Sequence, residues 1–158
     1  ASNVSNAVEQ QAHSLLVRAL KALDYIGVLA IECFEYQGAL IVNELAPRVH
    51  NSWHWTIEGA VTSQFANHVR AIAGLPLGST EARGHSGLVN LLGEIPPLGP
   101  VLALDDVHPH FYGKSPRAGR KVGHITFNAP TPKVVFERMK QTQEVITTNQ
   151  LHTQRTTP

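Results

Sequence analysis

The sequence has little of several features that would place it in a functional class at once. Its single cysteine, Cys33, excludes an intrachain disulfide framework and fits a reducing cytoplasm. No apolar run approaches the roughly 20 residues of a membrane-spanning helix, and the polar first residues do not resemble a signal peptide. With 13 basic and 12 acidic side chains, no charge of one sign favours nucleic acid or a membrane surface. Aromatic residues are only 6% of the chain and are not interleaved with basic ones, which argues against single-stranded nucleic acid.

What the chain does contain is a strong hairpin pattern near its first third. Two runs rich in β-formers, 28–36 and 39–46, are separated by Gln37-Gly38 and predict an antiparallel hairpin. Both runs are too apolar to face water on two sides, so we expect the hairpin to be mostly buried. Glu32 and Glu44 nevertheless lie inside these runs. A buried carboxylate is costly unless it is paired or binds a metal, so the two acids are candidate metal ligands.

The length of the hairpin loop decides whether these two acids can act together. Side chains alternate between the two faces of a strand. A two-residue turn would pair Glu32 with Asn43 and direct Glu44 to the other face. A three-residue loop, 37–39, would set Glu32 opposite Glu44 on one face. A metal site shared by the two acids therefore requires the three-residue loop.

The stretches on either side of the hairpin predict helices. An apolar stripe at helical spacing follows a capping pair, Asn6 and Glu9, and Gly27 is expected to end this helix. A chain that opens on such a helix looks truncated. A second helix is expected to begin at 62–63 and to stop at Gly74. Its predicted buried face consists of Phe65, Val69 and Ile72.

The second half of the chain has a different sequence pattern, with short apolar runs between turn residues. A polar, Gly/Pro-containing stretch at 75–84 predicts a boundary between two lobes. We therefore expect an α+β fold with one domain at 1–78 and a small antiparallel β-rich domain at 79–158. A helix is expected at 134–145, and the Thr/Gln-rich end after Ile146 is expected to be disordered. Short strands between turn residues are predicted at 87–93, 100–104, 108–112 and 121–127.

A longer motif runs from the second strand into the following loop. Residues 43–56 read Asn-Glu-Leu-Ala-Pro-Arg-Val-His-Asn-Ser-Trp-His-Trp-Thr, and the later segments 112–114 and 119–124 read Tyr-Gly-Lys and Gly-Arg-Lys-Val-Gly-His. Together they resemble the N5-carboxyaminoimidazole ribonucleotide synthetase family of the ATP-grasp superfamily, over roughly residues 4 to 128. Ala46, where many ATP-grasp enzymes have Asn, narrows the resemblance to the purine-synthesis branch. Trp53 departs from it, because that family typically has Gly there, which permits backbone angles or close ligand approach that Trp would not.

The resemblance implies a fold, a reaction and partners. The chain would be the C-terminal portion of an ATP-grasp domain, an antiparallel sheet with helices, followed by the small β-rich domain. The whole enzyme would use MgATP and bicarbonate to carboxylate 5-aminoimidazole ribonucleotide through carboxyphosphate, as a cytoplasmic homodimer with ATP and Mg²⁺ as cofactors. The family's N-terminal part, with a Rossmann-like domain and ATP-holding lysines, is not in this sequence, so we expect the isolated chain to be inactive. Neither nucleic acid nor membrane is expected as a partner.

The resemblance also implies roles for individual residues. Glu32 and Glu44 would bind Mg²⁺ and, through it, the phosphates of ATP. The catalytic set that would stabilise the bicarbonate-derived anion is Arg48, His50 and Asn51. The set that would bind the imidazole ribonucleotide and clamp its phosphate is Lys114, Arg120, Lys121 and His54.

Plainer interpretations stand beside these roles. The two acids could be solvated or paired with basic residues, and the basic turn could be a solvated surface. His50 and His54 could brace the loop, whereas zinc is disfavoured because the pair is not an HExxH motif. Glu58 is expected to brace the loop by accepting hydrogen bonds, and His124 to pack at a strand end. Alternative functions are another ATP-grasp carboxylase or formyl-phosphate ligase, such as the formate-dependent glycinamide ribonucleotide transformylase, or a non-catalytic docking or dimerisation module.

Overall fold

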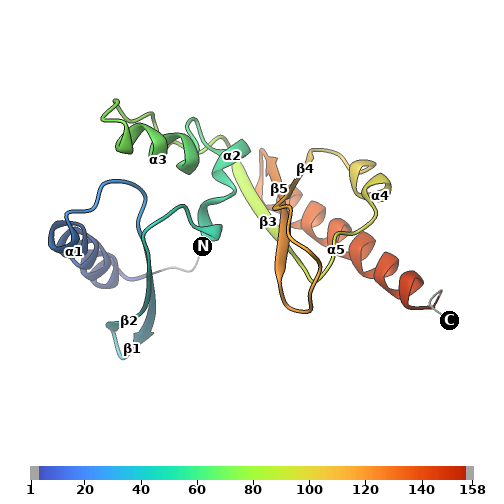
Figure 1. The fold of residues 1–158 in the computed structure, drawn as a ribbon, viewed down its shortest axis with the longest axis horizontal. Coiled ribbons are helices and arrows are strands. Elements are labelled where there is room, and N and C mark those ends of the chain that lie inside the picture. Colours follow the sequence, from blue (N-terminus) through green and yellow to red (C-terminus); the bar gives the residue numbers. More distant parts are fainter. Residues whose placement is uncertain (1–3, 156–158) are drawn as a thin grey trace. The chain divides into compact units, whose positions relative to one another are not determined.

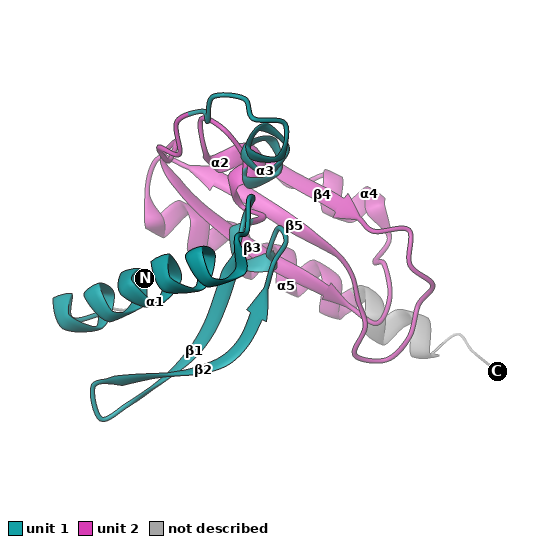
Figure 2. Cartoon of the chain, turned by 60° about the vertical axis from the view of Figure 1, so that its left-hand side comes forward, with its two compact units in different colours: residues 1–53, 64–78 teal, residues 54–63, 79–158 magenta. Residues whose placement is uncertain are grey.

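The protein was studied as a computed structural model that describes the backbone of residues 4–155 and the side chains of residues 4–148. The chain forms two compact units, described here one at a time. Figure 1 labels the helices and strands, and Figure 2 colours the two units. The first unit comprises residues up to 53 together with 64–78, and the second comprises 54–63 together with 79 onward. Both units combine helices with antiparallel strands, as predicted for an α+β chain. No helix in the described part of the chain is both long and apolar enough to cross a membrane.

The first unit opens with helix α1, Asn6–Leu23, close to the predicted span. Its capping differs from the prediction, because the Ser5 side chain, not Asn6, accepts the hydrogen bond from the Val8 amide. The helix ends before Gly27, at Asp24, which adopts a left-handed conformation with φ of 47°. Gly27 has another role. A Cβ there would lie 2.8 Å from the ring of His68, so a side chain would not fit.

Strands β1, Ala30–Tyr36, and β2, Ala39–Ala46, form the predicted hairpin. The loop is the two-residue turn Gln37-Gly38, with positive φ at both residues, and Tyr36 pairs with Ala39. Pairing then proceeds without interruption to Cys33 and Val42. At the next step the register shifts by one residue.

The register shift is a β-bulge in which Asn43 is the extra residue. Beyond it Glu32 pairs with Glu44. The prediction that opposed acids require a three-residue loop was therefore wrong about the loop. The acids do face each other across the ladder, because a bulge supplies the odd residue that the turn does not.

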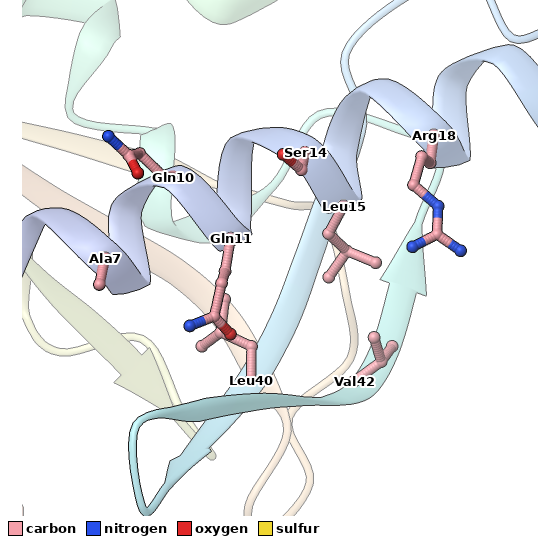
Figure 3. A pocket seen from close by; sticks show the side chains of 8 residues that line it. All are labelled: Ala7, Gln10, Gln11, Ser14, Leu15, Arg18, Leu40 and Val42. Atoms are coloured by element: carbon pink, nitrogen blue, oxygen red, sulfur yellow. The ribbon is translucent and has the colours of Figure 1, made fainter.

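The hairpin is more exposed than its composition predicted. Most residues of both strands are exposed, including Phe34 at 62% and Ile41 at 52%. Helix α1 packs on β2, and Gln11 of α1 donates a hydrogen bond to the Gly38 carbonyl at 2.9 Å. Figure 3 shows the shallow pocket between this helix and Leu40 and Val42 of the strand. The prediction of burial was wrong because a two-stranded sheet has only one helix of the described residues against it.

The remainder of this unit is a 3₁₀ turn, Asn51–Trp53, and helix α3, Gln64–Ile72. The prediction of a buried apolar face on α3 was wrong. The helix residue that is buried is instead the polar Gln64, at 7% exposure. The exposed side chains on the predicted face are Phe65, Val69 and Ile72.

The second unit contains a three-stranded antiparallel sheet in the order β3-β5-β4, with strands His85–Leu92, Lys121–Ala129 and Val107–Phe111. Helix α5, Pro132–Arg155, packs on β3 and β5, and the short helix α2, Thr56–Gly59, packs on β5. The central strand β5 is buried along most of its length. The core consists of Leu91, Val101, Val122, Ile125, Phe127 and Ile146.

Two predictions in this unit were wrong. The segment predicted as a strand at 100–104 belongs largely to helix α4, Leu98–Leu102, which turns Val101 into the core at 0% exposure. Helix α5 continues past Ile146 to Arg155, where we expected disorder, because no Pro or Gly interrupts this stretch and extending an anchored helix costs little. The last predicted disordered residues, 156–158, lie outside the described part of the chain. The domain boundary at 78/79 stays a prediction.

Candidate functional site

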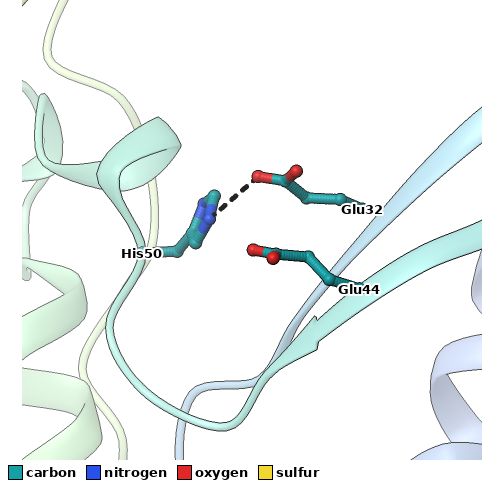
Figure 4. A group of neighbouring side chains, drawn as sticks. All are labelled: Glu32, Glu44 and His50. Atoms are coloured by element: carbon teal, nitrogen blue, oxygen red, sulfur yellow. Dashed lines mark ion pairs between the residues drawn. The ribbon is translucent and has the colours of Figure 1, made fainter. Parts of the chain in front are cut away.

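The first unit brings together Glu32, Glu44 and His50 (Figure 4). One candidate ligand atom from each of the three side chains lies within 4.8 Å of the other two. The two acids come from the opposed strands at the bulge, and His50 comes from the loop that follows β2. Two like charges directly opposite in a ladder are unfavourable, so this arrangement is not explained by hairpin stability. Carboxylates held side by side are suited to a hard divalent cation.

The imidazole of His50 has a defined orientation. Its Nε2 lies 3.1 Å from Oε1 of Glu32, and its Nδ1 lies 2.9 Å from the Ser52 hydroxyl and 3.4 Å from the Ser52 backbone nitrogen. A backbone N–H can only donate, so Nδ1 is an acceptor and the ring proton of neutral His50 sits on Nε2. That proton points at Glu32. His50 therefore orients the Glu32 carboxylate through its N–H.

A pocket of about 430 Å³ lies beside these groups in the same unit. Glu32, His50 and Ser52 provide its polar edge, and the rest of its lining is mostly apolar, from α1, β1 and Trp53. Trp53 is 51% exposed and is not among the residues with positive φ. The loop accommodates this ring in place of the expected Gly because its backbone at this position does not require Gly.

The other two predicted catalytic residues lie on the same loop. Arg48 is exposed, and its Nη1 donates to the carbonyl of Val49 at 3.0 Å. Asn51 begins the 3₁₀ turn and is half-buried. The first unit thus carries both candidate metal ligands and all three predicted catalytic residues. Their roles remain predictions.

The predicted phosphate-binding cations belong to the second unit, at the connection between β4 and β5. Lys114 is exposed and places its Nζ 5.2 Å from the centre of the Tyr112 ring. Arg120 is half-buried, and its Nη1 donates to the Ser115 carbonyl at 3.3 Å and to the Ser115 hydroxyl at 3.1 Å. Lys121 is half-buried at the start of β5. Their convergence on a single phosphate stays a prediction.

The second unit also contains a histidine cluster that we did not predict as a group. His124 and His110 are paired residues of β5 and β4, and their rings stack at 4.7 Å. His54, predicted to bind substrate, has its ring 4.9 Å from that of His124. The Tyr112 hydroxyl lies 2.6 Å from Nδ1 of His124. The alternation His108-Pro-His110 within a strand was the available signal, but only the fold reveals which residue lies opposite.

Burial decides the chemistry of this cluster. His124 is 2% exposed, in the middle of β5 and not at its end as expected. Desolvation, followed by the charges of His110, His54 and Lys121, lowers the pKa of His124 to about 4. Burial raises the pKa of the Tyr112 hydroxyl. The ring of His124 is therefore neutral near neutral pH and acts as a packed, hydrogen-bonded core residue.

Glu58 of α2 braces the same sheet, in line with its predicted bracing role. One carboxylate oxygen accepts a hydrogen bond from the Thr126 hydroxyl at 2.5 Å, and the other lies 2.9 Å from Nε2 of His110. These contacts attach residues 54–63 to β4 and β5 within the second unit. Glu58 therefore has a structural role in this unit.

Two family descriptions match this chain. Residues 1–65 match the ATP-grasp domain, and residues 86–138 match the phosphoribosylaminoimidazole carboxylase C-terminal domain. Among curated proteins, the N5-carboxyaminoimidazole ribonucleotide synthase of Pseudomonas aeruginosa is 53% identical over 129 residues, covering 82% of this chain and 36% of that protein. The protein of the same name from Escherichia coli is 48% identical over 122 residues, covering 77% and 34%. The chain thus spans about a third of the length of these relatives.

Solved structures give the same result. N5-carboxyaminoimidazole ribonucleotide synthetase from Thermus thermophilus superimposes with a TM-score of 0.83 at 52% identity, covering 92% of this chain and 41% of that chain. The synthase from Aspergillus clavatus, solved with ADP and 5-aminoimidazole ribonucleotide, gives a TM-score of 0.77 at 36% identity, covering 92% and 42%. On the combined weight of the two domain matches, the relatives and these structures, the chain belongs to the N5-carboxyaminoimidazole ribonucleotide synthase family of ATP-grasp proteins.

Proposed function

We propose that this chain is part of an ATP-dependent carbon–nitrogen ligase of purine biosynthesis. The reaction joins bicarbonate to the exocyclic amine of 5-aminoimidazole ribonucleotide. ATP is cleaved to ADP and phosphate, and the product is N5-carboxyaminoimidazole ribonucleotide. Bicarbonate attacks the γ-phosphorus of ATP and ADP leaves, which forms carboxyphosphate. The amine then takes the carboxyl group from carboxyphosphate, or from the CO₂ that it releases, and phosphate departs.

The observation that carries this proposal is the Glu32–Glu44 pair at the bulge. The pair fits Mg²⁺, which binds proteins through one or two carboxylates and completes its coordination with phosphate oxygens and water. Both side chains are exposed, so oxygens not bonded to His50 are accessible to an ion. When bound there, Mg²⁺ supplies charge neutralisation and alignment of the ATP phosphates.

Nearby polar side chains in each unit supply the rest of the proposed chemistry. Arg48 offers a planar array of donors that suits bicarbonate and carboxyphosphate, and Asn51 can both donate and accept. In the second unit, Lys114, Arg120 and Lys121 share one β4–β5 connection with no acid between them, which suits a ribose phosphate. His54 adds a polar ring beside Tyr112. We also propose a cytoplasmic homodimer as the working form.

A chimera tests this function directly. The matched segment of the Pseudomonas aeruginosa synthase would be replaced by the corresponding residues of this chain, and phosphate release from ATP measured with bicarbonate and 5-aminoimidazole ribonucleotide. We expect turnover that depends on both substrates and on Mg²⁺. Glu44→Gln in the chimera should lower kcat by at least about a hundredfold, because one of the two groups positioning the metal is lost. The isolated 158-residue chain should show no turnover.

The matched control is Glu35→Gln. Glu35 is an exposed acid on the same strand, but three residues from Glu32 and thus on the opposite face. Its loss should leave turnover unchanged. If the chimera is active and Glu44→Gln and Glu35→Gln have the same turnover, the proposed role of Glu44 in metal binding is contradicted. A chimera that cleaves ATP without needing 5-aminoimidazole ribonucleotide would point instead to a different ATP-grasp ligase.

A further inference from the structure

The buried side chain of Gln64 is bonded directly to His50. Gln64 is the first residue of α3, and it is 7% exposed. Its Oε1 accepts a hydrogen bond from the His50 backbone N–H at 2.9 Å, and its Nε2 donates to the His50 carbonyl at 2.8 Å. One amide thus binds both backbone groups of a residue 14 positions earlier. This two-point contact fixes the position and rotation of the His50 backbone.

The same histidine is constrained at its ring. Ser52 bonds to Nδ1, and Nε2 lies 3.1 Å from Glu32. With the backbone fixed by Gln64 and Nδ1 occupied by Ser52, the Nε2 proton can point only toward the carboxylate. A continuous series of contacts therefore joins Gln64, through His50, to Glu32.

We propose that Gln64 is a positioning residue for the metal site: by fixing His50 it sets the orientation of the Glu32 carboxylate opposite Glu44. This inference rests on the proposed function, since it assumes that the two acids bind a divalent cation. Gln64 is not among the candidate metal ligands and acts through His50. It belongs to the outer layer of contacts around a metal site, whose loss typically lowers metal affinity by about 10- to 100-fold.

The competing explanation is that the amide merely satisfies two buried backbone groups and contributes to folding alone. The same helix provides a matched control. Asn67, one turn along α3, makes an equivalent two-point contact with Gly78, donating to its carbonyl at 3.1 Å and accepting from its N–H at 2.9 Å. Asn67→Ala and Gln64→Ala each remove an α3 amide that bonds to both backbone groups of one residue. Only Gln64→Ala releases His50.

The first measurement needs no enzyme activity. The 158-residue chain, with ¹⁵N-labelled histidine, would be examined by long-range ¹H–¹⁵N spectra at mildly alkaline pH, where neutral tautomers are distinguished. We expect a pure Nε2–H form of His50 in the unsubstituted chain and in Asn67→Ala. Gln64→Ala should give a mixture of tautomers. Gln64→Glu should lie between the two, because it keeps the acceptor for the His50 N–H but loses the donor to its carbonyl.

The second measurement is the affinity for Mn²⁺ alone, by paramagnetic broadening or calorimetry. Gln64→Ala should weaken binding by about tenfold or more, with Asn67→Ala unchanged. In the chimera, Gln64→Ala should raise the Mg²⁺ concentration needed for half-maximal turnover and leave KM for 5-aminoimidazole ribonucleotide unchanged.

The outcomes separate the two proposals. Equal changes in the His50 tautomer for Gln64→Ala and Asn67→Ala, or none in either, would overturn the positioning role. If the tautomer responds as expected but Glu32→Gln binds Mn²⁺ as well as the unsubstituted chain does, the positioning of His50 stands and the metal site of the proposed function falls. Gln64→Glu keeps the test decisive should the alanine variant fail to fold.

Discussion

Each unit contains one pair of like ionisable residues directly opposite each other in an antiparallel ladder, and the two pairs have opposite environments. Glu32 and Glu44 are exposed and Glu32 lines a pocket, whereas His124, stacked on His110, is 2% exposed in the centre of a sheet. The exposed pair leaves carboxylate oxygens accessible, which favours ligand binding. In the other pair, burial lowers the pKa of His124, so its neutral ring stacks closely on the half-buried His110. The same local pattern thus serves a candidate site in one unit and a folded core in the other.

The largest expected difference between the units is in the cost of removing an aromatic side chain. Phe127 of β5 is 1% exposed, so Phe127→Ala should destabilise the second unit by about 3–5 kcal/mol. Phe34 of β1 is 62% exposed, and Phe34→Ala should change stability by only about 0.5 kcal/mol. Hydrogen exchange of β5 and β1 amides across a urea series measures both. Comparable losses would show that the hairpin is as well packed as the sheet.

The second prediction concerns the loss of stability of the second unit at acidic pH. The folded pKa of His124 is about 4, below the 6.5 of an unperturbed histidine, so between these values the unfolded chain binds more protons than the folded one. Stability present above pH 6.5 should therefore be lost as pH falls toward 4, by roughly 3 kcal/mol for this residue. Urea unfolding of the second unit across this range measures the loss, and His124→Gln should flatten it. A ring resonance of His124 that titrates near its ordinary pKa would contradict the prediction.

A smaller effect is expected at Glu58, which joins α2 to the histidine pair. Glu58→Gln removes the charged acceptor of Thr126 and the partner of His110, and should cost about 1–3 kcal/mol. Glu81→Gln, an exposed acid in the same unit, is the control and should be nearly neutral. Urea unfolding of both variants makes the comparison. Equal effects would mean that these contacts add nothing to stability.

The smallest expected effect is an increase in stability, whereas the preceding substitutions decrease it. Glu44→Gln removes a like charge opposite Glu32, so it should stabilise the metal-free first unit by about 0.5 kcal/mol, less in high salt. Glu35→Gln, opposite Leu40, should have no such effect. Thermal unfolding at low and high salt measures both. Destabilisation by Glu44→Gln would indicate that the pair exists for the hairpin and not for a ligand.

Local sequence patterns were sufficient to predict most helices and strands, but not how exposed these elements are. The two β-rich runs of 28–46 and the turn residues between them identified the hairpin, and helical spacing identified α1. Exposure was predicted wrongly for the hairpin and for α3, because an apolar stripe indicates what a face could pack against, not whether this chain supplies that layer. The run at 100–104 was misassigned because short apolar stretches fit a strand and a buried helical turn equally well.

The same distinction holds for the candidate site: its residue types could be predicted from the sequence, and the contacts between them could not. The motif around Glu44, Arg48 and His50 was visible as residue types at a spacing, and so was the basic turn at Lys114 to Lys121. The contacts of Gln64 with His50 were not visible, because a hydrogen bond across 14 residues depends on where α3 folds back. His124 was expected at a strand end for a related reason. Its burial depends on strands β3 and β4, which pair with β5 on either side.

By itself the sequence determined where the hairpin and most other strands form, which chemistry they carry and which family the motif resembles, because turn residues and side-chain type are local properties. Only the tertiary structure decided that Glu32 meets Glu44. Counting residues around a two-residue turn directs the two acids to opposite faces, and the bulge at Asn43 reverses that result. The same is true of the histidine stack, since strand pairing sets which residues are opposed and burial then sets which of them can carry charge.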